Sequence, residues 1–199
     1  MSKTLRERIN EYENNVVFGY NDFLDYGNYD SIRKALIRLS NSGVINRLID
    51  GVYYKPKYSS LTNERIPVRI EDVAEYMASR YGWNIVPCEE LALNYIGLSE
   101  QVPSKYVYLS TGPYRKYQIE NRDLSFKHTA NRNLFNMSYD SALLIQGIKG
   151  IGKDKIQESD IKIIKKRFSK ESIDKAIAEC KNVPTWIYET IKRIGREYD

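Results

Sequence analysis

The stretch SIRKALIRLSNSGVINRLIDGVYYKPK, residues 31–57, places the strongest constraint on the fold of this chain. Its first half repeats apolar residues every three or four positions, the spacing of one buried helix face: Ile32, Ala35, Leu36 and Leu39. Asp30 or Ser31 can cap the start of this helix, and Gly43 can end it in the left-handed conformation. The pattern predicts an amphipathic helix over residues 31–42.

Two short β-strands follow this helix. Residues 44–49 and 52–55 are rich in β-branched and aromatic side chains. The intervening Asp50-Gly51 favours a hairpin turn of type I′. Pro56 then ends the second strand, because proline has no N–H to donate to a neighbouring strand.

Two further helices are predicted before this stretch, over residues 4–14 and 20–25. The resulting order is three helices followed by a hairpin. That order is typical of a winged helix-turn-helix, in which the third helix enters a DNA groove. We therefore expect a winged helix-turn-helix domain over residues 1–60.

The polar face of the third predicted helix carries residue types that reach phosphates and base edges: Ser31, Arg33, Lys34, Arg38 and Asn41. Three cations of the hairpin would contact phosphates: Arg47, Lys55 and Lys57. Residues 1–57 hold nine Lys or Arg against seven Asp or Glu, so the net charge is only +2. The acidic residues, however, cluster in the first two helices. Basic clustering on one face is typical of DNA binding, and an ordinary solvated helix face is the alternative.

Length and composition bound the class of protein. A chain of 199 residues with 42% hydrophobic residues can form one domain or two small ones with their own cores. It has no run of about 18 apolar residues and no apolar signal peptide, so we expect a cytoplasmic protein without a membrane span. The two cysteines, Cys88 and Cys180, lie in separate helical patterns and are expected to be free thiols.

The polar stretch at residues 58–65 lacks periodicity and contains several turn formers, which indicates a linker to a second domain at 66–199. In that domain the patterns predict helices at 70–81, 88–96, 141–148, 159–168, 172–181 and 185–197, and strands at 83–87, 105–110, 115–119 and 124–127. The expected fold class is α+β: an N-terminal winged helix-turn-helix followed by a mixed α+β domain with a helical C-terminal tail.

No residue pattern indicates an active site. With a single histidine, His128, and no Cys or His cluster, a structural zinc site is not expected. The segment at 147–153 has the glycines and lysine of a phosphate loop, but Asp154 stands where a Ser or Thr would hold magnesium. The same segment is similar to the hairpin of helix-hairpin-helix DNA modules, and a glycine cap at a helix end explains it most simply. We expect a protein that is not an enzyme and has no cofactor and no metal.

Two other regions are candidate interaction surfaces. The predicted hairpin of the second domain carries interleaved cations and tyrosines: Tyr114, Arg115, Lys116, Tyr117, Arg122 and Lys127. Such a surface suits a protein partner or a nucleic-acid single strand, and an edge strand protected by charges is the alternative. Residues 149–199 hold thirteen basic and nine acidic side chains, which fits either an acidic partner or simple solvation.

Several segments after the predicted hairpin occur in an order that carries a family resemblance. They are GWNIVP at 82–87, ALNYIGL at 92–98, QVP at 101–103 and VYLSTGP at 107–113. Together with residues 31–57, they resemble the AbiEi family of abortive-infection antitoxins over most of residues 20–135. The resemblance implies a bacterial transcriptional autoregulator with a winged helix and a C-terminal domain needed for antitoxin activity. The usual genetic partner is a nucleotidyltransferase-like toxin of the AbiEii type, which the antitoxin need not bind directly.

By position, the family's DNA-reading helix corresponds to residues 31–42 and its wing to residues 44–57. The leading hypothesis is a sequence-specific DNA-binding regulator of its own promoter, the antitoxin of a type IV toxin-antitoxin pair. Regulators of this type often act as homodimers on inverted repeats of double-stranded DNA. The alternative is a protein-interaction module whose second domain engages a toxin or another partner without DNA binding.

Overall fold

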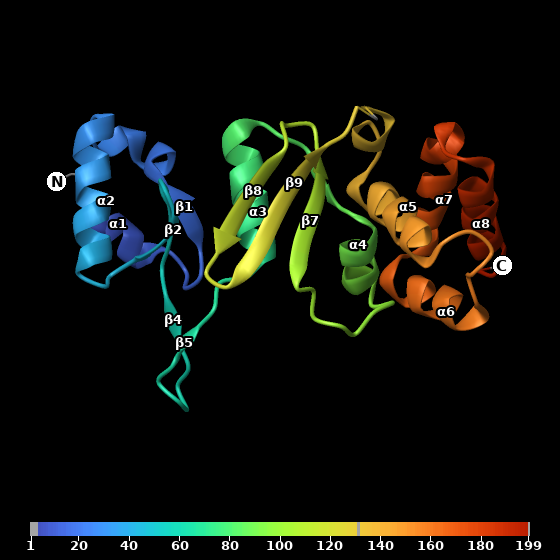
Figure 1. Ribbon diagram of the computed structural model, residues 1–199, viewed down its shortest axis with the longest axis horizontal. Helices are drawn as coiled ribbons and strands as arrows, with labels where there is room; N and C mark the ends of the chain where they lie inside the picture. Colours follow the sequence, from blue (N-terminus) through green and yellow to red (C-terminus); the bar gives the residue numbers. More distant parts are fainter. Residues whose placement is uncertain (1–3, 131, 199) are drawn as a thin grey trace. The chain divides into compact units, whose positions relative to one another are not determined.

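The computed structural model describes residues 4–130 and 132–198, which fold into a mixture of helices and β-strands (Figure 1). The expected α+β class is confirmed. The chain forms two compact units, one of Met1–Gly82 with Tyr117–Leu124 and one of Trp83–Lys116 with Ser125–Asp199. No helix within the described residues is long and apolar enough to cross a membrane.

The first unit contains most of the elements expected from the first 60 residues. Its elements are α1 (Leu5–Glu11), β1 (Val17–Gly19), the 3-10 helix η1 (Tyr20–Tyr26), α2 (Tyr29–Asn41), β2 (Asn46–Ile49), β3 (Val52–Tyr54), β4 (Lys57–Tyr58), β5 (Arg65–Ile66) and α3 (Ile70–Tyr81). The three expected helices are confirmed within a few residues. The cap of α2 was predicted wrongly, because Asn28 rather than Asp30 or Ser31 accepts the free N–H, 2.9 Å from the Ser31 nitrogen.

A three-stranded antiparallel sheet in the order β1-β3-β2 packs against the helices. Strand β1 was not predicted, and it pairs with β3 so that Phe18 lies opposite Tyr53. The predicted hairpin of β2 and β3 is present, but the expected type I′ turn is wrong. Such a turn needs positive φ at both central residues, and of the two only Gly51 has it. A register shift between Arg47 and Ile49 accommodates the difference.

An aromatic core joins the sheet to the three helices. The buried residues that form it are Ile9, Phe18, Phe23, Ile32, Leu36, Ile45 and Tyr53. The rings of Phe18 and Phe23 meet edge to face, with centroids 5.6 Å apart, which is a favourable geometry for an aromatic pair. Helix α2 therefore has one face, that of Ile32 and Leu36, fixed in this core.

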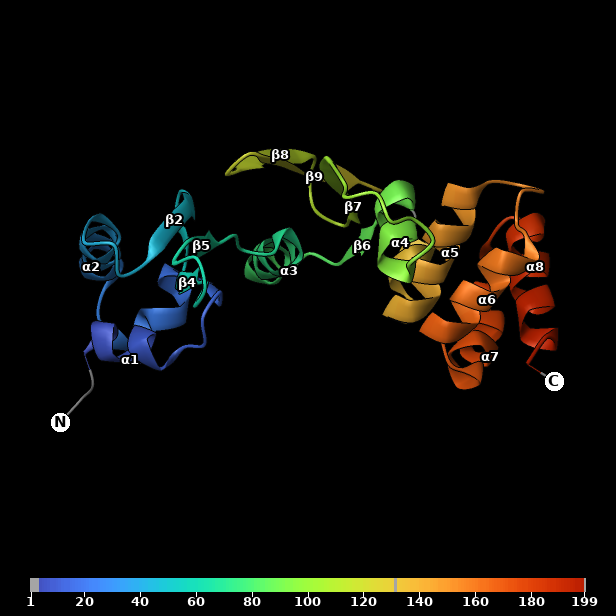
Figure 2. The same ribbon diagram turned by 90° about the horizontal axis from the view of Figure 1, so that it is seen from below.

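The segment predicted as a linker is instead a hairpin of β4 and β5, which projects from the first unit in Figure 1 and is seen end-on in Figure 2. Its tip is ordered by local hydrogen bonds that polar composition alone does not reveal. The Ser59 hydroxyl oxygen accepts the N–H groups of Leu61 and Thr62, and Asn63 adopts a left-handed conformation. Leu61 at this tip is 95% exposed.

Helix α3 packs within the first unit, so the expected boundary at residues 60–66 falls inside that unit. The Tyr76 hydroxyl donates to Asp22 at 2.8 Å, and the Arg80 guanidinium donates to the Gly51 carbonyl at 3.1 Å. Gly19 lies close to the Gly51 carbonyl that Arg80 binds. A Cβ on residue 19 would lie 2.5 Å from that carbonyl oxygen. The helix ends at Gly82, as predicted, in the left-handed conformation.

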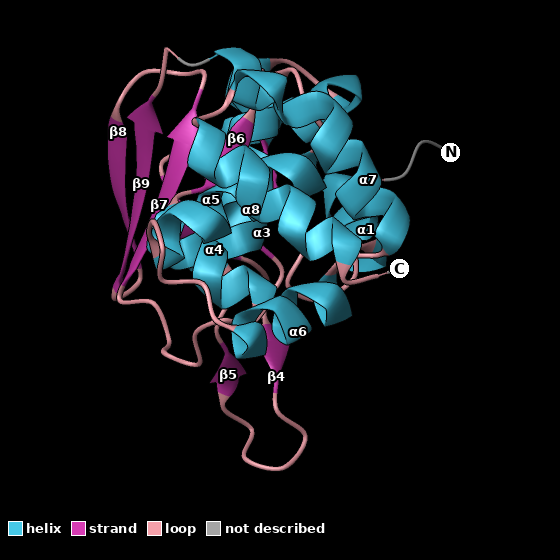
Figure 3. Ribbon diagram, turned by 90° about the vertical axis from the view of Figure 1, so that its right-hand side faces the viewer, coloured by secondary structure: helices cyan, strands magenta, loops and turns pink. Residues whose placement is uncertain are grey.

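The second unit combines strands with a helical bundle. Its elements, with the hairpin that it shares with the first unit, are β6 (Ile85–Pro87), α4 (Glu89–Ile96), β7 (Lys105–Ser110), β8 (Arg115–Ile119), β9 (Arg122–His128), η2 (Arg132–Phe135), α5 (Tyr139–Ile151), α6 (Glu158–Arg167), α7 (Lys170–Glu179), η3 (Cys180–Asn182) and α8 (Thr185–Arg196). The strands form a sheet in the order β6-β7-β9-β8, and Figure 3 shows β7, β9 and β8 side by side. All the predicted helices and strands of this region are present.

Glycines set the packing of α4 against α5. Both helices belong to a buried cluster of mostly aliphatic side chains. A Cβ on Gly147 would lie 2.3 Å from Ile96 Cδ1, and one on Gly150 would lie 2.9 Å from the Glu89 carbonyl oxygen. Helix α5 continues to Ile151 and is capped by Gly152 at φ 95°. The predicted glycine cap is confirmed, and Gly147 and Gly150 belong to a helix interior rather than a phosphate loop.

Both cysteines are free thiols, as predicted. Cys180 is buried, and burial raises the pKa of its thiol to about 11. Cys88 is half-buried, and desolvation raises its pKa as well.

Candidate nucleic-acid interface

The outer face of α2 presents the polar residues that the sequence singled out. Ser31, Arg33, Lys34, Arg38 and Asn41 are all exposed, whereas Ile32 and Leu36 between them are buried. The spacing of three and four residues aligns Ser31, Lys34, Arg38 and Asn41 along one side of the helix. Arg33 lies beside this line on the exposed part of the helix, and we call Arg33, Lys34, Arg38 and Asn41 the α2 row.

The side chains of the α2 row have no hydrogen bond or ion pair with any residue in the described parts of the chain. Ser31 differs, because its hydroxyl donates to the Asn28 carbonyl at 2.8 Å. Three cations and an amide on one exposed helix face therefore keep their hydrogen-bonding capacity for an external group.

The three hairpin cations have different environments. Arg47 donates to Asp50 at 2.5 Å and to the Ile49 carbonyl at 3.3 Å, and its side chain is still 49% exposed. Lys57 is exposed at the start of β4 and forms no hydrogen bond or ion pair within the described residues. Both can approach a phosphate, since a surface ion pair such as that of Arg47 is weak.

Lys55 points elsewhere. Its ammonium donates to the carbonyl oxygens of Asn10 and Tyr12, each at 2.7 Å. These carbonyls lie at the C-terminal end of α1, where a cation also interacts favourably with the helix dipole. The structure therefore does not bring Lys55 together with the α2 row.

An acidic groove of about 530 Å³ lies elsewhere in the first unit and includes Glu13, Asp72 and Glu75 among its lining residues. Desolvation raises the pKa of Asp72, and desolvation followed by the nearby charge of Asp72 raises the pKa of Glu75. Sequence patterns did not indicate this groove, because its walls come from the residues after α1 and from α3. The described residues contain no group of three or more His, Cys, Asp or Glu that could hold a metal ion.

The second expected surface is divided between the two units. In the second unit, Tyr114, Arg115, Lys116 and Lys127 are exposed, and the Lys116 ammonium lies 5.7 Å from the centre of the Tyr114 ring. In the first unit, Tyr117 is half-buried, and the Arg122 guanidinium donates to the Val68 carbonyl at 2.8 Å and to Glu120 at 3.1 Å.

Arg122 is thus bound within its own unit rather than being open to a partner. His128 has a comparable structural contact, with its Nδ1 3.0 Å from the Gly112 carbonyl oxygen.

A family model matches residues 4–176, which is most of the chain. The chain belongs to the family of unknown function DUF6088. The α2 row and the β2–β3 hairpin both lie inside the region that defines DUF6088, and α8 lies beyond it. No curated protein matches the chain.

Sequence reasoning found the α2 row, because a helix face is a local pattern. It could not separate Lys55 from Lys57. Both are lysines next to Pro56, and the partners of Lys55 lie more than 40 residues away.

Proposed function

We propose that this DUF6088 chain is a sequence-specific DNA-binding transcriptional regulator whose first unit is a winged helix-turn-helix. The order α1, β1, η1, α2, β2, β3 and the sheet order β1-β3-β2 support this proposal. In a winged helix, a strand between the first two helices pairs beside the hairpin in the same way. In this arrangement α2 is the recognition helix and β2–β3 is the wing.

The observation that carries the proposal is the α2 row. Arg33, Lys34, Arg38 and Asn41 are exposed on a helix whose opposite face is buried, and they have no hydrogen bond or ion pair with the described residues. The row spans eight helical steps, or about 12 Å, and a helix of this kind fits the major groove. Arginine recognises guanine and asparagine recognises adenine through paired hydrogen bonds, so Arg38 and Asn41 are proposed to read bases.

Phosphate contacts are proposed for Arg47 and Lys57, which follow the recognition helix in sequence and are exposed. Lys55 is proposed to act on the fold of the first unit instead, through its two bonds to the end of α1. Phosphate contacts of this type fix the register of a protein on DNA and add salt-dependent affinity.

The resemblance to AbiEi antitoxins supports a narrower proposal. The operator is the chain's own promoter, bound as a homodimer on an inverted repeat, and the regulator is the antitoxin of a type IV pair. Its functional partner is a nucleotidyltransferase-like toxin, without a requirement for a stable complex. The protein acts in the cytoplasm and is not an enzyme.

Fluorescence anisotropy tests this proposal. The purified chain is titrated onto its own upstream DNA and onto a scrambled duplex, each across a series of salt concentrations. Specificity appears as the ratio of the two affinities, and phosphate contacts appear as the salt slope. With two phosphate contacts from each protomer of the homodimer, four in all, we expect log K to fall with log salt at a slope of about −3.6.

Failure to bind either duplex at low salt would refute the proposal. In that case the winged helix serves as a scaffold, and the chain is better described as a protein-interaction module. Co-purification with the product of a neighbouring gene would then identify the partner.

A further inference from the structure

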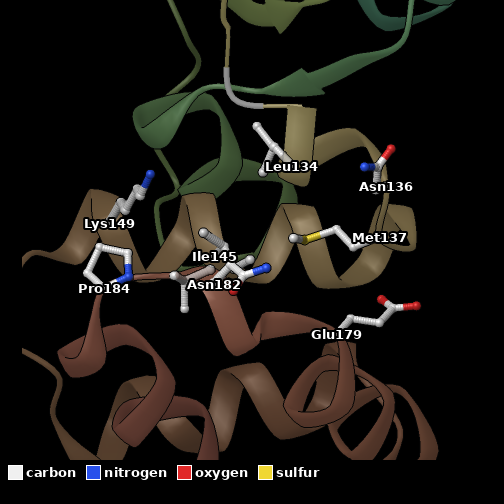
Figure 4. A pocket seen from close by; sticks show the side chains of 9 residues that line it. Leu134, Asn136, Met137, Ile145, Lys149, Glu179, Asn182 and Pro184 are labelled. Carbon is white, nitrogen blue, oxygen red and sulfur yellow. The ribbon is translucent and has the colours of Figure 1, made fainter.

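A pocket of about 260 Å³ lies entirely within the second unit. Figure 4 shows that its residues come from three places: the segment before α5, helix α5 itself, and the end of α7 with the connection to α8. They are Leu134, Asn136, Met137, Ile145, Lys149, Glu179, Asn182, Val183 and Pro184. The pocket is large enough for a small organic molecule.

The polarity of this pocket is asymmetric. Leu134, Met137, Ile145 and Val183 give it apolar walls. One cation and one anion line it as well, and Figure 4 places Lys149 and Glu179 on opposite sides with Ile145 between them. A molecule that fills the pocket meets opposite charges at its two ends and hydrocarbon in the middle.

Glu179 is held in place as an anion. Its Oε2 accepts hydrogen bonds from the Ser138 backbone N–H at 2.9 Å and from the Ser138 hydroxyl at 2.8 Å. Its Oε1 lies 3.9 Å from the Lys175 ammonium, beyond hydrogen-bonding distance. Partial burial acts to raise the pKa of Glu179, but the donors from Ser138 and Ser141 outweigh it, so the pKa is lowered. One carboxylate oxygen therefore remains able to accept from a ligand.

Lys149 is the matching cation. It is half-buried one helical turn after Ile145 and has no hydrogen bond or ion pair with the residues that the structure describes. The side-chain amides of Asn136 and Asn182 likewise have no hydrogen-bond partner among those residues. A half-buried ammonium at a pocket wall, unpaired while an anion stands across the cavity, fits a ligand that supplies the missing anionic group.

We propose that this pocket binds a small ω-amino carboxylate, a zwitterion whose carboxylate and ammonium are separated by a short alkyl chain. The ligand carboxylate pairs with Lys149, and the ligand ammonium donates to Glu179. The methylene groups lie against Ile145 and Val183. This site is independent of DNA binding, because all of its residues belong to the second unit.

Isothermal titration calorimetry of the full chain, without DNA, tests the site. The probes are γ-aminobutyrate, δ-aminovalerate and ε-aminocaproate, which differ only in chain length. Caproate and pentylamine each lack one of the two charges. We expect one zwitterion to bind at a single site about tenfold or more tightly than either singly charged probe, because each charged hydrogen bond contributes at that level.

Lys149→Met and the matched control Lys153→Met assign the binding to this pocket. Both variants remove one positive charge from the second unit, and Lys153 is exposed and does not line the pocket. We expect Lys149→Met to weaken binding of the best zwitterion about tenfold or more and Lys153→Met to leave it unchanged. Circular dichroism confirms that both variants fold.

Three results would each overturn the proposal: no saturable binding of any zwitterion to the parent chain, equal binding of caproate, or full binding by the folded Lys149→Met variant. Since no DNA is present, none of these results bears on the regulator proposal.

Discussion

The two basic regions of the chain, the first 57 residues and the C-terminal helices, differ in what their cations contact. In the C-terminal helices, Lys192 pairs with Glu189 at 3.8 Å, and Arg193 pairs with Glu158. Lys165 donates to the Glu197 carbonyl, and its ammonium lies 4.7 Å from the centre of the Tyr198 ring. On α2, by contrast, none of the cations of the α2 row has a hydrogen bond or ion pair within the described residues.

By net charge alone, the C-terminal helices are the more basic of the two regions. Residues 149–199 carry thirteen basic and nine acidic side chains, a net of +4, whereas residues 1–57 carry only +2. Carboxylates and carbonyls of the C-terminal helices already neutralise or bind several of their cations. The net charge of a segment therefore does not by itself identify a phosphate-binding surface, and the arrangement of cations on one helix face must be considered as well.

The largest expected effect comes from removing the anchor of α2. Leu36 is 1% exposed in the aromatic core, and Leu36→Ala is expected to lower the free energy of unfolding by about 2–5 kcal/mol. Leu61→Ala is the matched control, because Leu61 is 95% exposed and its loss should cost less than about 0.5 kcal/mol. Urea denaturation measures both. Equal costs for the two variants would contradict the packing of α2.

A pair of cation variants tests the comparison directly. Arg38→Ala is expected to weaken binding to the specific duplex by about 1–3 kcal/mol, since it removes a base contact. Lys166→Ala on α6 is the control, because Lys166 is also exposed and forms no ion pair within the part of the chain that the structure describes. We expect it to leave the affinity unchanged in anisotropy. An equal loss for both variants would show that the C-terminal helices also contact DNA.

Substitutions of Lys55 and Lys57 distinguish a contribution to the stability of the fold from a contribution to DNA binding. Lys55→Met removes two hydrogen bonds from an ammonium to the end of α1 and is expected to cost about 1–3 kcal/mol of stability. Lys57→Met is expected to leave stability unchanged and to reduce the salt slope of DNA binding by about one for each bound protomer. Thermal denaturation and the anisotropy salt series read out the two effects. The reverse assignment of effects would refute the distinction.

A substitution in the acidic groove is expected to have the smallest effect on stability. The pKa of Glu75 is raised, so the folded state binds more protons than the unfolded chain, and this contribution to stability is lost as the pH rises through the folded pKa. Glu75→Gln is therefore expected to raise stability at neutral pH by roughly 0.3 kcal/mol after screening by solvent. The gain should disappear below about pH 4, where the unfolded group is protonated. Urea denaturation at both pH values checks the sign, and a gain that grows at low pH would contradict it.

Local patterns predicted most of the fold. The end of α3 at Gly82 and the exact bounds of β7 and β8 follow from glycine punctuation and β-branched or aromatic runs. Strand β1 was missed because it has only three residues, and its partner β3 lies more than 30 residues away. The β4–β5 hairpin lies where the sequence predicts a linker. Side-chain hydrogen bonds to Ser59 order its polar tip, which has no apolar periodicity.

The functional residues, like the fold, could be predicted from the sequence only in part. The α2 row could be predicted because its residues share one helix. The role of Lys55 could not, because both of its acceptors are backbone carbonyls, which no residue pattern identifies. The small-molecule pocket was also invisible, since Lys149 and Glu179 lie 30 residues apart on different helices.

The first unit is assembled from two separate pieces of chain, Met1–Gly82 and Tyr117–Leu124. A single recombination crossover after Gly82 would leave behind the strand ends that complete this unit, including Glu120, which pairs with Arg65 at 3.0 Å. A gene fragment that carries the whole unit must also carry residues 83–116 of the other. The two units are thus expected to be inherited together rather than exchanged as interchangeable modules.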